Sequence, residues 1–211
     1  MIDGRIPIHW CWVQGAEVLP ETFRKNLAAW RAILPEDFVL VGWDHRSGSA
    51  AFPFYAEHAD RMSHPAMRAD LILLHAQVHL GGLVIGTDMR PNRGAPLFER
   101  MRRGSGFLVK DRRGHFYNGM SYAPRPWEPP FAEILQQILM APERFTEPYV
   151  PGATGPMRWT SILGGMDHGL DVLSETDVWT RSYWESAGAR PDAWVDPGFA
   201  ASHDESLNPR P

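Results

Sequence analysis

Short apolar runs alternate along this chain with longer segments in which hydrophobic residues recur at helical spacing. Residues 6–13 and 38–43 are rich in β-branched and aromatic side chains, which predicts two strands. Residues 21–34 lie between them and predict an amphipathic helix, with one apolar face made of Phe23, Leu27, Trp30 and Leu34. A strand, a helix and a strand in this order favour a right-handed parallel unit.

The segment at residues 67–91 has the clearest pattern in the chain. A helix is predicted first, with an apolar stripe made of Met67, Leu71, Leu74 and Val78. Two glycines follow at positions where helices end, and the apolar run 83–85 then predicts a strand buried on both faces. Asp88 comes next, in a turn that we expect to be exposed at the strand's carboxyl end, where open α/β sheets bind ligands.

The remaining patterns predict further elements of the same domain. Residues 46–51 are small and polar and predict a loop, whereas residues 52–60 predict a short helix. Two strands around a turn are expected within residues 105–117, and helices at residues 131–140 and 159–163. Residues 186–211 contain few large apolar side chains and predict a tail. We find no internal repeat and expect residues 1–211 to form a single domain.

Composition is typical of a globular domain. The 211 residues include 44% hydrophobic and 22% charged residues, and the net charge of −4 provides no bulk attraction for nucleic acid. No run approaches the roughly 20 apolar residues of a membrane-spanning helix. The single cysteine, Cys11, excludes an internal disulfide and fits a reducing compartment. We therefore expect a soluble, cytoplasmic protein.

A sequence block around the acidic turn resembles a known enzyme family. Arg68, Ala69, Asp70 and Leu71 are followed by Gly81, Gly82 and Asp88 at the spacing of the glycosyltransferase family with the DXD sugar-binding region. This family includes α-mannosyl- and α-galactosyltransferases and, more distantly, toxin glucosyltransferase domains. The chain departs from its pattern at Gly86, where the first aspartate of the DXD is usual, and at Val84, where tyrosine is usual.

Shorter matches flank this block in the family's order. His9 and Trp12 match the histidine and tryptophan of the opening segment, and Asp44 follows Trp43 as in the family's W-D pair. Further on, the segment beginning at Asn118 resembles the family's segment under the sugar, and residues 154–156 match its T-G-P signature. His203 lies in a partial echo of the closing segment, without its tryptophan.

The resemblance implies an α/β protein with a type-A glycosyltransferase fold, a mixed and mostly parallel sheet flanked by helices. It implies transfer of a hexose from a UDP- or GDP-sugar, with retention of configuration, to an unidentified hydroxyl acceptor. Mn²⁺ or Mg²⁺ on the diphosphate would suit aspartate ligands. The implied catalytic residues are Asp88 and Asn118, and the implied metal ligands are Asp88 and His203. The implied donor-binding residues are Trp12, Arg68, Asp70, Thr154 and Gly155.

Several alternatives remain open at these positions. Asp88 can be a solvated turn residue, Asp70 a partner of a neighbouring arginine, Arg68 a surface charge and Trp12 a core residue. Since Gly86 lacks a carboxylate, a non-catalytic protein that binds a nucleotide sugar or glycan is the alternative function. The acceptor is open among sugars, lipids, peptides and nucleic-acid bases, with the net charge against the last.

Other chemistries fit the sequence poorly. His75 and His79 have the spacing of a zinc pair, but residue 76 is alanine, so the HExxH motif is absent and both are expected to be surface or hydrogen-bonded residues. The sequence has neither a phosphate-binding G-x-x-x-x-G-K-[ST] loop nor a G-x-G-x-x-G after the first strand.

Overall fold

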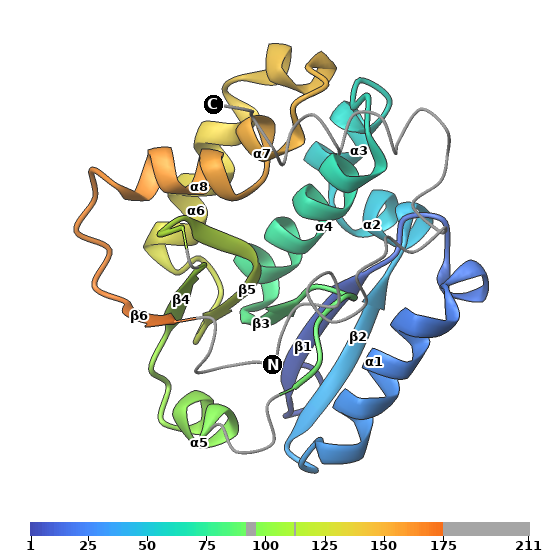
Figure 1. The fold of residues 1–211 in the computed structure, drawn as a ribbon, viewed down its shortest axis with the longest axis vertical. Coiled ribbons are helices and arrows are strands. Elements are labelled where there is room, and N and C mark those ends of the chain that lie inside the picture. Colours follow the sequence, from blue (N-terminus) through green and yellow to red (C-terminus); the bar gives the residue numbers. More distant parts are fainter. Residues whose placement is uncertain (92–95, 112, 175–211) are drawn as a thin grey trace.

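A six-stranded mixed sheet forms the centre of the molecule in the computed structural model, which describes residues 1–91, 96–111 and 113–174 (Figure 1). The strand order is β2-β1-β3-β5-β4-β6, and only β5 runs against the others. The strands are β1 (Ile6–Cys11), β2 (Phe38–Trp43), β3 (Gly82–Ile85), β4 (Phe107–Lys110), β5 (Phe116–Ala123) and β6 (Asp171–Ser174). The expected mixed, mostly parallel sheet is therefore confirmed.

Helices flank both faces of this sheet. The α-helices are α1 (Glu21–Ile33), α2 (His45–Ala51), α3 (Pro53–Ala59), α4 (Pro65–Leu80), α5 (Leu97–Arg102), α6 (Pro129–Leu139), α7 (Val150–Ala153) and α8 (Pro156–Leu163). Two 3-10 helices, η1 (Ala16–Val18) and η2 (Pro142–Thr146), complete the described elements. None of the helices in these ranges is long and apolar enough to cross a membrane.

The period-two alternation of the strands builds two cores, one on each face of the sheet. In β1, Ile8 and Trp10 point into the core shared with α1 and α5, whereas Cys11 joins the core shared with α3, α4, α6 and α8. The central strand β3 is buried along its whole length and contributes to both cores, as its apolar run predicts. The protein therefore has three layers.

Helix α4 is buried around most of its circumference, more than its predicted single apolar face requires. The expected stripe is buried, but so are Ile72, Leu73 and the polar residue Gln77. Gln77 donates to the carbonyls of Gly82 and Ser121 at 3.3 and 2.8 Å, so its amide is satisfied inside the core. These two hydrogen bonds fix α4 to the β3–β5 pair.

The prediction for His75 is wrong. The sequence placed this residue on the partly polar side of α4, yet its side chain is only 1% exposed. Its ring lies nearly parallel to those of Phe52 and His79, with centroid distances of 5.4 and 5.7 Å, and neither ring nitrogen has a hydrogen-bond partner among the described residues. Residues from the α2–α3 junction cover this side of α4, which the periodicity of α4 alone cannot reveal.

The prediction of a loop at residues 46–51 is also wrong, because these residues form α2. Asp44 caps the helix: its Oδ1 accepts from the Ser47 amide at 2.6 Å, and the Ser47 hydroxyl accepts from the Asp44 amide at 2.9 Å. This reciprocal capping box satisfies amides at the start of a helix that has little intrinsic propensity. Asp44 thus has a structural role at the carboxyl end of β2.

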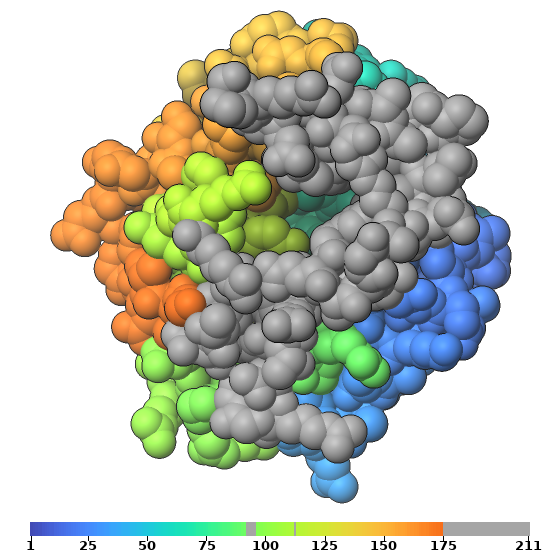
Figure 2. Space-filling view, viewed as in Figure 1, coloured from blue at the N-terminus to red at the C-terminus, as the bar shows by residue number. Residues whose placement is uncertain are grey.

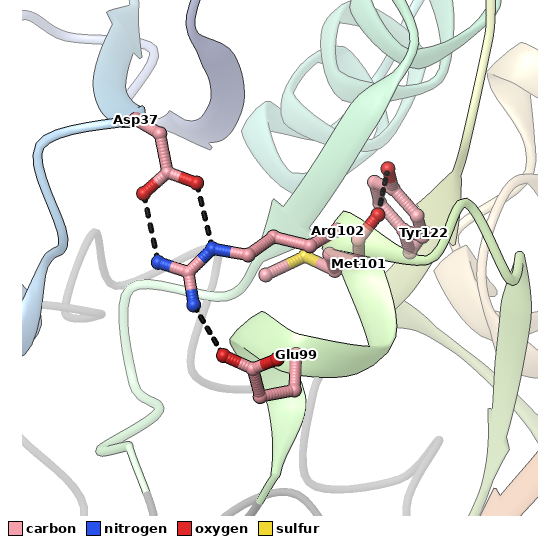
Figure 3. A network of polar contacts seen from close by, with 5 residues as sticks. All are labelled: Asp37, Glu99, Met101, Arg102 and Tyr122. Carbon is pink, nitrogen blue, oxygen red and sulfur yellow. Dashed lines mark hydrogen bonds and ion pairs between the residues drawn. The ribbon is translucent and has the colours of Figure 1, made fainter.

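Helix α5 is tied to the segment before β2 by a network of polar contacts (Figure 3). Arg102 donates from Nε and Nη2 to the two carboxylate oxygens of Asp37, at 2.7 and 2.8 Å, and from Nη1 to Glu99 at 2.6 Å. The Tyr122 hydroxyl donates to the Met101 carbonyl at 3.1 Å, which joins α5 to β5. The network lies at the amino end of β2, opposite the carboxyl ends of the parallel strands.

Candidate functional site

The turn that follows β3 is held tightly at the carboxyl edge of the sheet. The Met89 amide donates to the Gly86 carbonyl at 3.1 Å, which closes a four-residue turn with Thr87 and Asp88 at its centre. The Gly86 amide donates to the Gly119 carbonyl at 2.7 Å and extends the pairing with β5. Met89 is fully buried, and Asp88 is half-buried rather than exposed as expected.

The glycine at position 86 leaves room for the Asp88 carboxylate. A Cβ atom at Gly86 would lie 2.5 Å from Asp88 Oδ1, so this carboxylate folds back over the glycine. The described turn therefore presents one carboxylate, located where a side chain at position 86 would begin.

Three residues that the resemblance implied come together beside this turn. Asp70, near the start of α4, accepts hydrogen bonds at both carboxylate oxygens. Asn118 Nδ2 donates to Oδ1 at 2.8 Å and Thr154 Oγ1 donates to Oδ2 at 2.7 Å. Asn118 precedes the glycine that binds the turn, and Thr154 immediately follows α7. Two donors from distant parts of the chain thus bind one carboxylate, and Thr154 lies 84 positions from Asp70 in the sequence.

The electrostatic setting of Asp70 is unusual for a carboxylate. Burial raises its pKa to about 7, and the hydrogen bonds from Thr154 and Asn118 only partly oppose that shift. Neither donor is a cation, so the salt bridge considered for Asp70 is not formed in the described part of the chain. A carboxyl group that titrates near neutrality, with further lone pairs available, suits binding of hydroxyl groups.

Arg68 lies two residues before Asp70 on the same helix. Its Nη2 makes a long bond of 3.5 Å to the Met62 carbonyl, and its buried Nε has no hydrogen-bond partner among the described residues. A planar guanidinium with unused donors is suited to a phosphate or carboxylate.

Gly155, next to Thr154, allows α7 and α8 to pack closely beside this cluster. A Cβ atom there would lie 2.9 Å from the Pro151 Cα, so the close approach of α7 and α8 requires glycine. The adjacent Thr154 is buried, and its hydroxyl donates to Asp70 Oδ2.

Trp12 follows β1 and lies in a core rather than beside Asp70. Its ring is 8% exposed and packs against Phe23 of α1, with centroids 5.4 Å apart. His9 from the same segment is buried and bridges two elements: Trp43 Nε1 donates to His9 Nδ1 at 3.2 Å, and His9 Nε2 lies 2.8 Å from the Gly81 carbonyl. Both contacts fit a neutral ring protonated at Nε2. His203 and the tail lie outside the described residues.

Two residues that contact the acidic turn were not predicted to have a role there. Asn26 and Trp30 of α1 donate to the Thr87 and Met89 carbonyls at 3.0 and 3.1 Å. The available signal was Asn26 itself, a polar residue at a core-facing position of α1 one turn from Trp30.

On the face shown in Figure 2, the teal of the α3–α4 region is visible next to the yellow-green of the β4–β5 hairpin. Asp70 lies on α4 and Asn118 on β5, the two elements that carry most of the cluster. Among the described residues, no three His, Cys, Asp or Glu side chains form a group suited to a metal ion.

Comparison with known proteins gives a match at the level of structure. A scan against protein-family models finds no match, and neither does a search of curated proteins. The solved structures, in contrast, include a protein with a glycosyltransferase fold that this chain resembles. The PaToxG glycosyltransferase superposes with a TM-score of 0.58 and 16% sequence identity, over 78% of this chain and 70% of its own. The α/β glycosyltransferase-like fold expected from the sequence is therefore confirmed.

Proposed function

We propose that this protein is a retaining glycosyltransferase that moves a hexose from a UDP- or GDP-sugar to a hydroxyl acceptor. The observation that carries the proposal is the convergence of Asn118 and Thr154 on Asp70, at the carboxyl edge of a glycosyltransferase-like sheet. Ligands of open α/β sheets bind at this edge. The retaining outcome and the hexose follow from the family resemblance.

The residues of the site would divide the work of binding the donor. Asp70 has lone pairs beyond the two hydrogen bonds it accepts, and these would receive hydroxyl groups of the ribose or the transferred sugar. Asn118 would orient the sugar through its remaining amide groups, and Arg68 would attract the diphosphate through the charge of its guanidinium group. Positioning of this kind supplies much of the rate acceleration in group transfer.

A divalent cation fits the described residues only in part. Asp88 provides one hard oxygen ligand, and its carboxylate has the charge that Mn²⁺ or Mg²⁺ prefers. No three-residue cluster accompanies it in the described ranges, so the diphosphate and water would complete the shell. Bound there, the cation would neutralise charge on the departing diphosphate.

The test is a screen of UDP- and GDP-sugars by thermal shift, with and without Mn²⁺, followed by an assay of donor hydrolysis. We expect one donor to raise the melting temperature and to be hydrolysed slowly, since transferases use water as a poor acceptor. The variant Asp88→Ala should lose the part of donor binding that depends on Mn²⁺. Equal donor affinity in this variant and the parent contradicts the role of Asp88.

The alternative function is non-catalytic binding of a nucleotide sugar or glycan. The observation in its favour is Gly86, together with the missing cluster of metal ligands among the described residues. The two functions differ in one result. A donor that binds without being hydrolysed, at saturating Mn²⁺ and over hours, identifies a binding protein.

A further inference from the structure

Helix α1 holds the acidic turn through two buried side chains. Asn26 Nδ2 donates to the Thr87 carbonyl at 3.0 Å, and Trp30 Nε1 donates to the Met89 carbonyl at 3.1 Å. The two donors are four residues apart and lie on the same face of the helix. Their target carbonyls belong to the residues on either side of Asp88.

The opposite side of the turn is fixed by the sheet. Gly86 donates to the Gly119 carbonyl of β5 and accepts from the Met89 amide. Three hydrogen bonds thus tie the backbone of residues 86–89 to α1 and β5, and a fourth closes the turn itself, with Asp88 at its centre. The point at which the Asp88 side chain leaves the backbone is thereby fixed.

Asparagine is an energetically unfavourable residue at position 26. It is 2% exposed and lies among Phe23, Leu27 and Trp30 on the core face of α1. Asparagine is a poor residue for a helix interior, and a buried amide requires a partner. A leucine would fill similar space without either disadvantage, but it would leave the Thr87 carbonyl without its donor.

We propose that Asn26 and Trp30 are positioning residues that set the location of the Asp88 carboxylate for a nucleotide diphosphate and its cation. This inference rests on the proposed function. The two side chains act through the turn and do not touch the ligand. Loss of either bond should displace Asp88 and weaken the interaction that depends on it.

The variants are Asn26→Leu and Trp30→Phe. Each removes one donor: Asn26→Leu keeps a side chain of similar size, and Trp30→Phe keeps one aromatic ring in the core. The matched control is Tyr122→Phe, which removes another buried bond of 3.1 Å from a side chain to a backbone carbonyl, at α5 (Figure 3). Each variant is made with Asp88 and also with Asp88→Ala. The probes are UDP and GDP with Mn²⁺, measured by calorimetry.

We expect Asn26→Leu and Trp30→Phe to weaken Mn²⁺–nucleotide binding about 10-fold when Asp88 is present and by less than about 2-fold in the Asp88→Ala background. Amide hydrogen exchange in the peptide containing residues 86–89 should become about 10-fold faster without ligand. Tyr122→Phe should change neither quantity, even if it lowers the melting temperature.

The outcomes separate the two proposals. If the parent binds neither nucleotide, the proposed function and this inference both fail. If the parent binds but the α1 variants bind as Tyr122→Phe does, or lose equal affinity with and without Asp88, only the positioning role fails. If Asn26→Leu does not fold, Trp30→Phe decides the matter alone, since it keeps the ring in the core.

Discussion

At the scale of single residues, the central feature is a carboxyl group with two neutral hydrogen-bond donors. Asp70 is held by Asn118 and Thr154, and burial raises its pKa to about 7. A small change in its surroundings therefore decides whether it carries a charge at neutral pH. A bound cation or the hydroxyl groups of a donor would favour the ionised form.

Replacement of Asp70 tests this role directly. Asp70→Asn keeps the shape and one acceptor for Asn118, whereas its amide nitrogen must donate to the Thr154 hydroxyl instead of accepting from it. The charge is removed, so donor affinity should fall by about 1–3 kcal/mol, the range for a hydrogen bond to a charged group. In the parent, affinity should weaken as the pH falls through 7, because the binding form is the carboxylate. Calorimetry between pH 6 and 8 measures both effects. A variant that binds donor normally at lower thermal stability assigns Asp70 to structure alone.

Gly86 offers a second test at this scale. Gly86→Asp adds the carboxylate that the family pattern places there, and the Asp88 side chain must turn away from its Cβ atom. Mn²⁺ bound without nucleotide should then be held about 10-fold more tightly, or about 1.4 kcal/mol. Gly86→Ala introduces the same steric contact without the charge and should bring no gain. Equal Mn²⁺ affinity in both variants excludes a cation site at this turn.

At the scale of elements, the regular patterns predicted much of the framework. The strand at residues 38–43 has the predicted bounds, and the predicted helices correspond to α1, α3, α4, α6 and α8 with ends shifted by a few residues. The failures arose where tertiary contacts or caps decide. The helix α2 depends on the bonds between Asp44 and Ser47, and the burial of His75 depends on Phe52 from another element. The strand β6 has only four residues, and the two at its start are exposed.

The difference between local patterns and tertiary contacts also applies to the candidate site. The resemblance selected Asp70, Asn118 and Thr154, which the fold brings together, but no periodicity of the sequence indicates that they share hydrogen bonds. Asn26 and Trp30 were placed only as members of α1, because a bond from a helix to a turn about 60 positions away depends on the complete fold.

The capping box of α2 provides a prediction at this scale. Asp44→Ala removes the acceptor for the Ser47 amide and should cost about 0.5–2 kcal/mol of folding stability, the usual range for an N-cap. Urea denaturation at pH 7 measures the loss, and Asp44→Asn should recover most of it, because asparagine caps helices well. If Asp44→Ala is as stable as the parent but loses donor binding, Asp44 belongs to the site rather than to the helix.

At the scale of the whole molecule, buried titratable groups make folding stability depend on pH in opposing directions. Burial lowers the pKa of His9 to about 4 and of His75 to about 3, with His79 and His58 adding to the shift at His75. Between pH 4 and 6.5 these histidines therefore bind protons in the unfolded chain but remain neutral in the folded chain. Their contribution makes the folding stability fall as the pH falls. Asp70 acts oppositely: the folded state holds its proton up to about pH 7, so its contribution to stability is lost as the pH rises from about 4 to 7.

The balance of these groups leads to our last prediction. His9 and His75 against Asp70 leave the unfolded state about one proton richer, and His79, whose pKa burial also lowers, adds to this excess. The parent should therefore lose at least about 1.4 kcal/mol of stability per pH unit between pH 6 and 4.5. Asp44 and Asp37 have lowered pKa values and affect stability mainly below this window. His75→Leu removes one titrating group and should flatten the curve. At pH 7 it should be as stable as the parent or more stable, because neither ring nitrogen of His75 has a hydrogen-bond partner among the described residues.

Asp70→Asn removes the opposing group and should make the same curve steeper than in the parent. Urea denaturation at half-unit pH steps, with the slope of unfolding checked to be constant, measures all three curves. Relative to the parent, His75→Leu thus makes folding stability less dependent on pH, and Asp70→Asn makes it more dependent on pH. Parallel curves for the parent and His75→Leu would show that the His75 ring is protonated in the folded state. Its burial against the Phe52 and His79 rings makes that unfavourable, since a charge there would have no partner and little access to water.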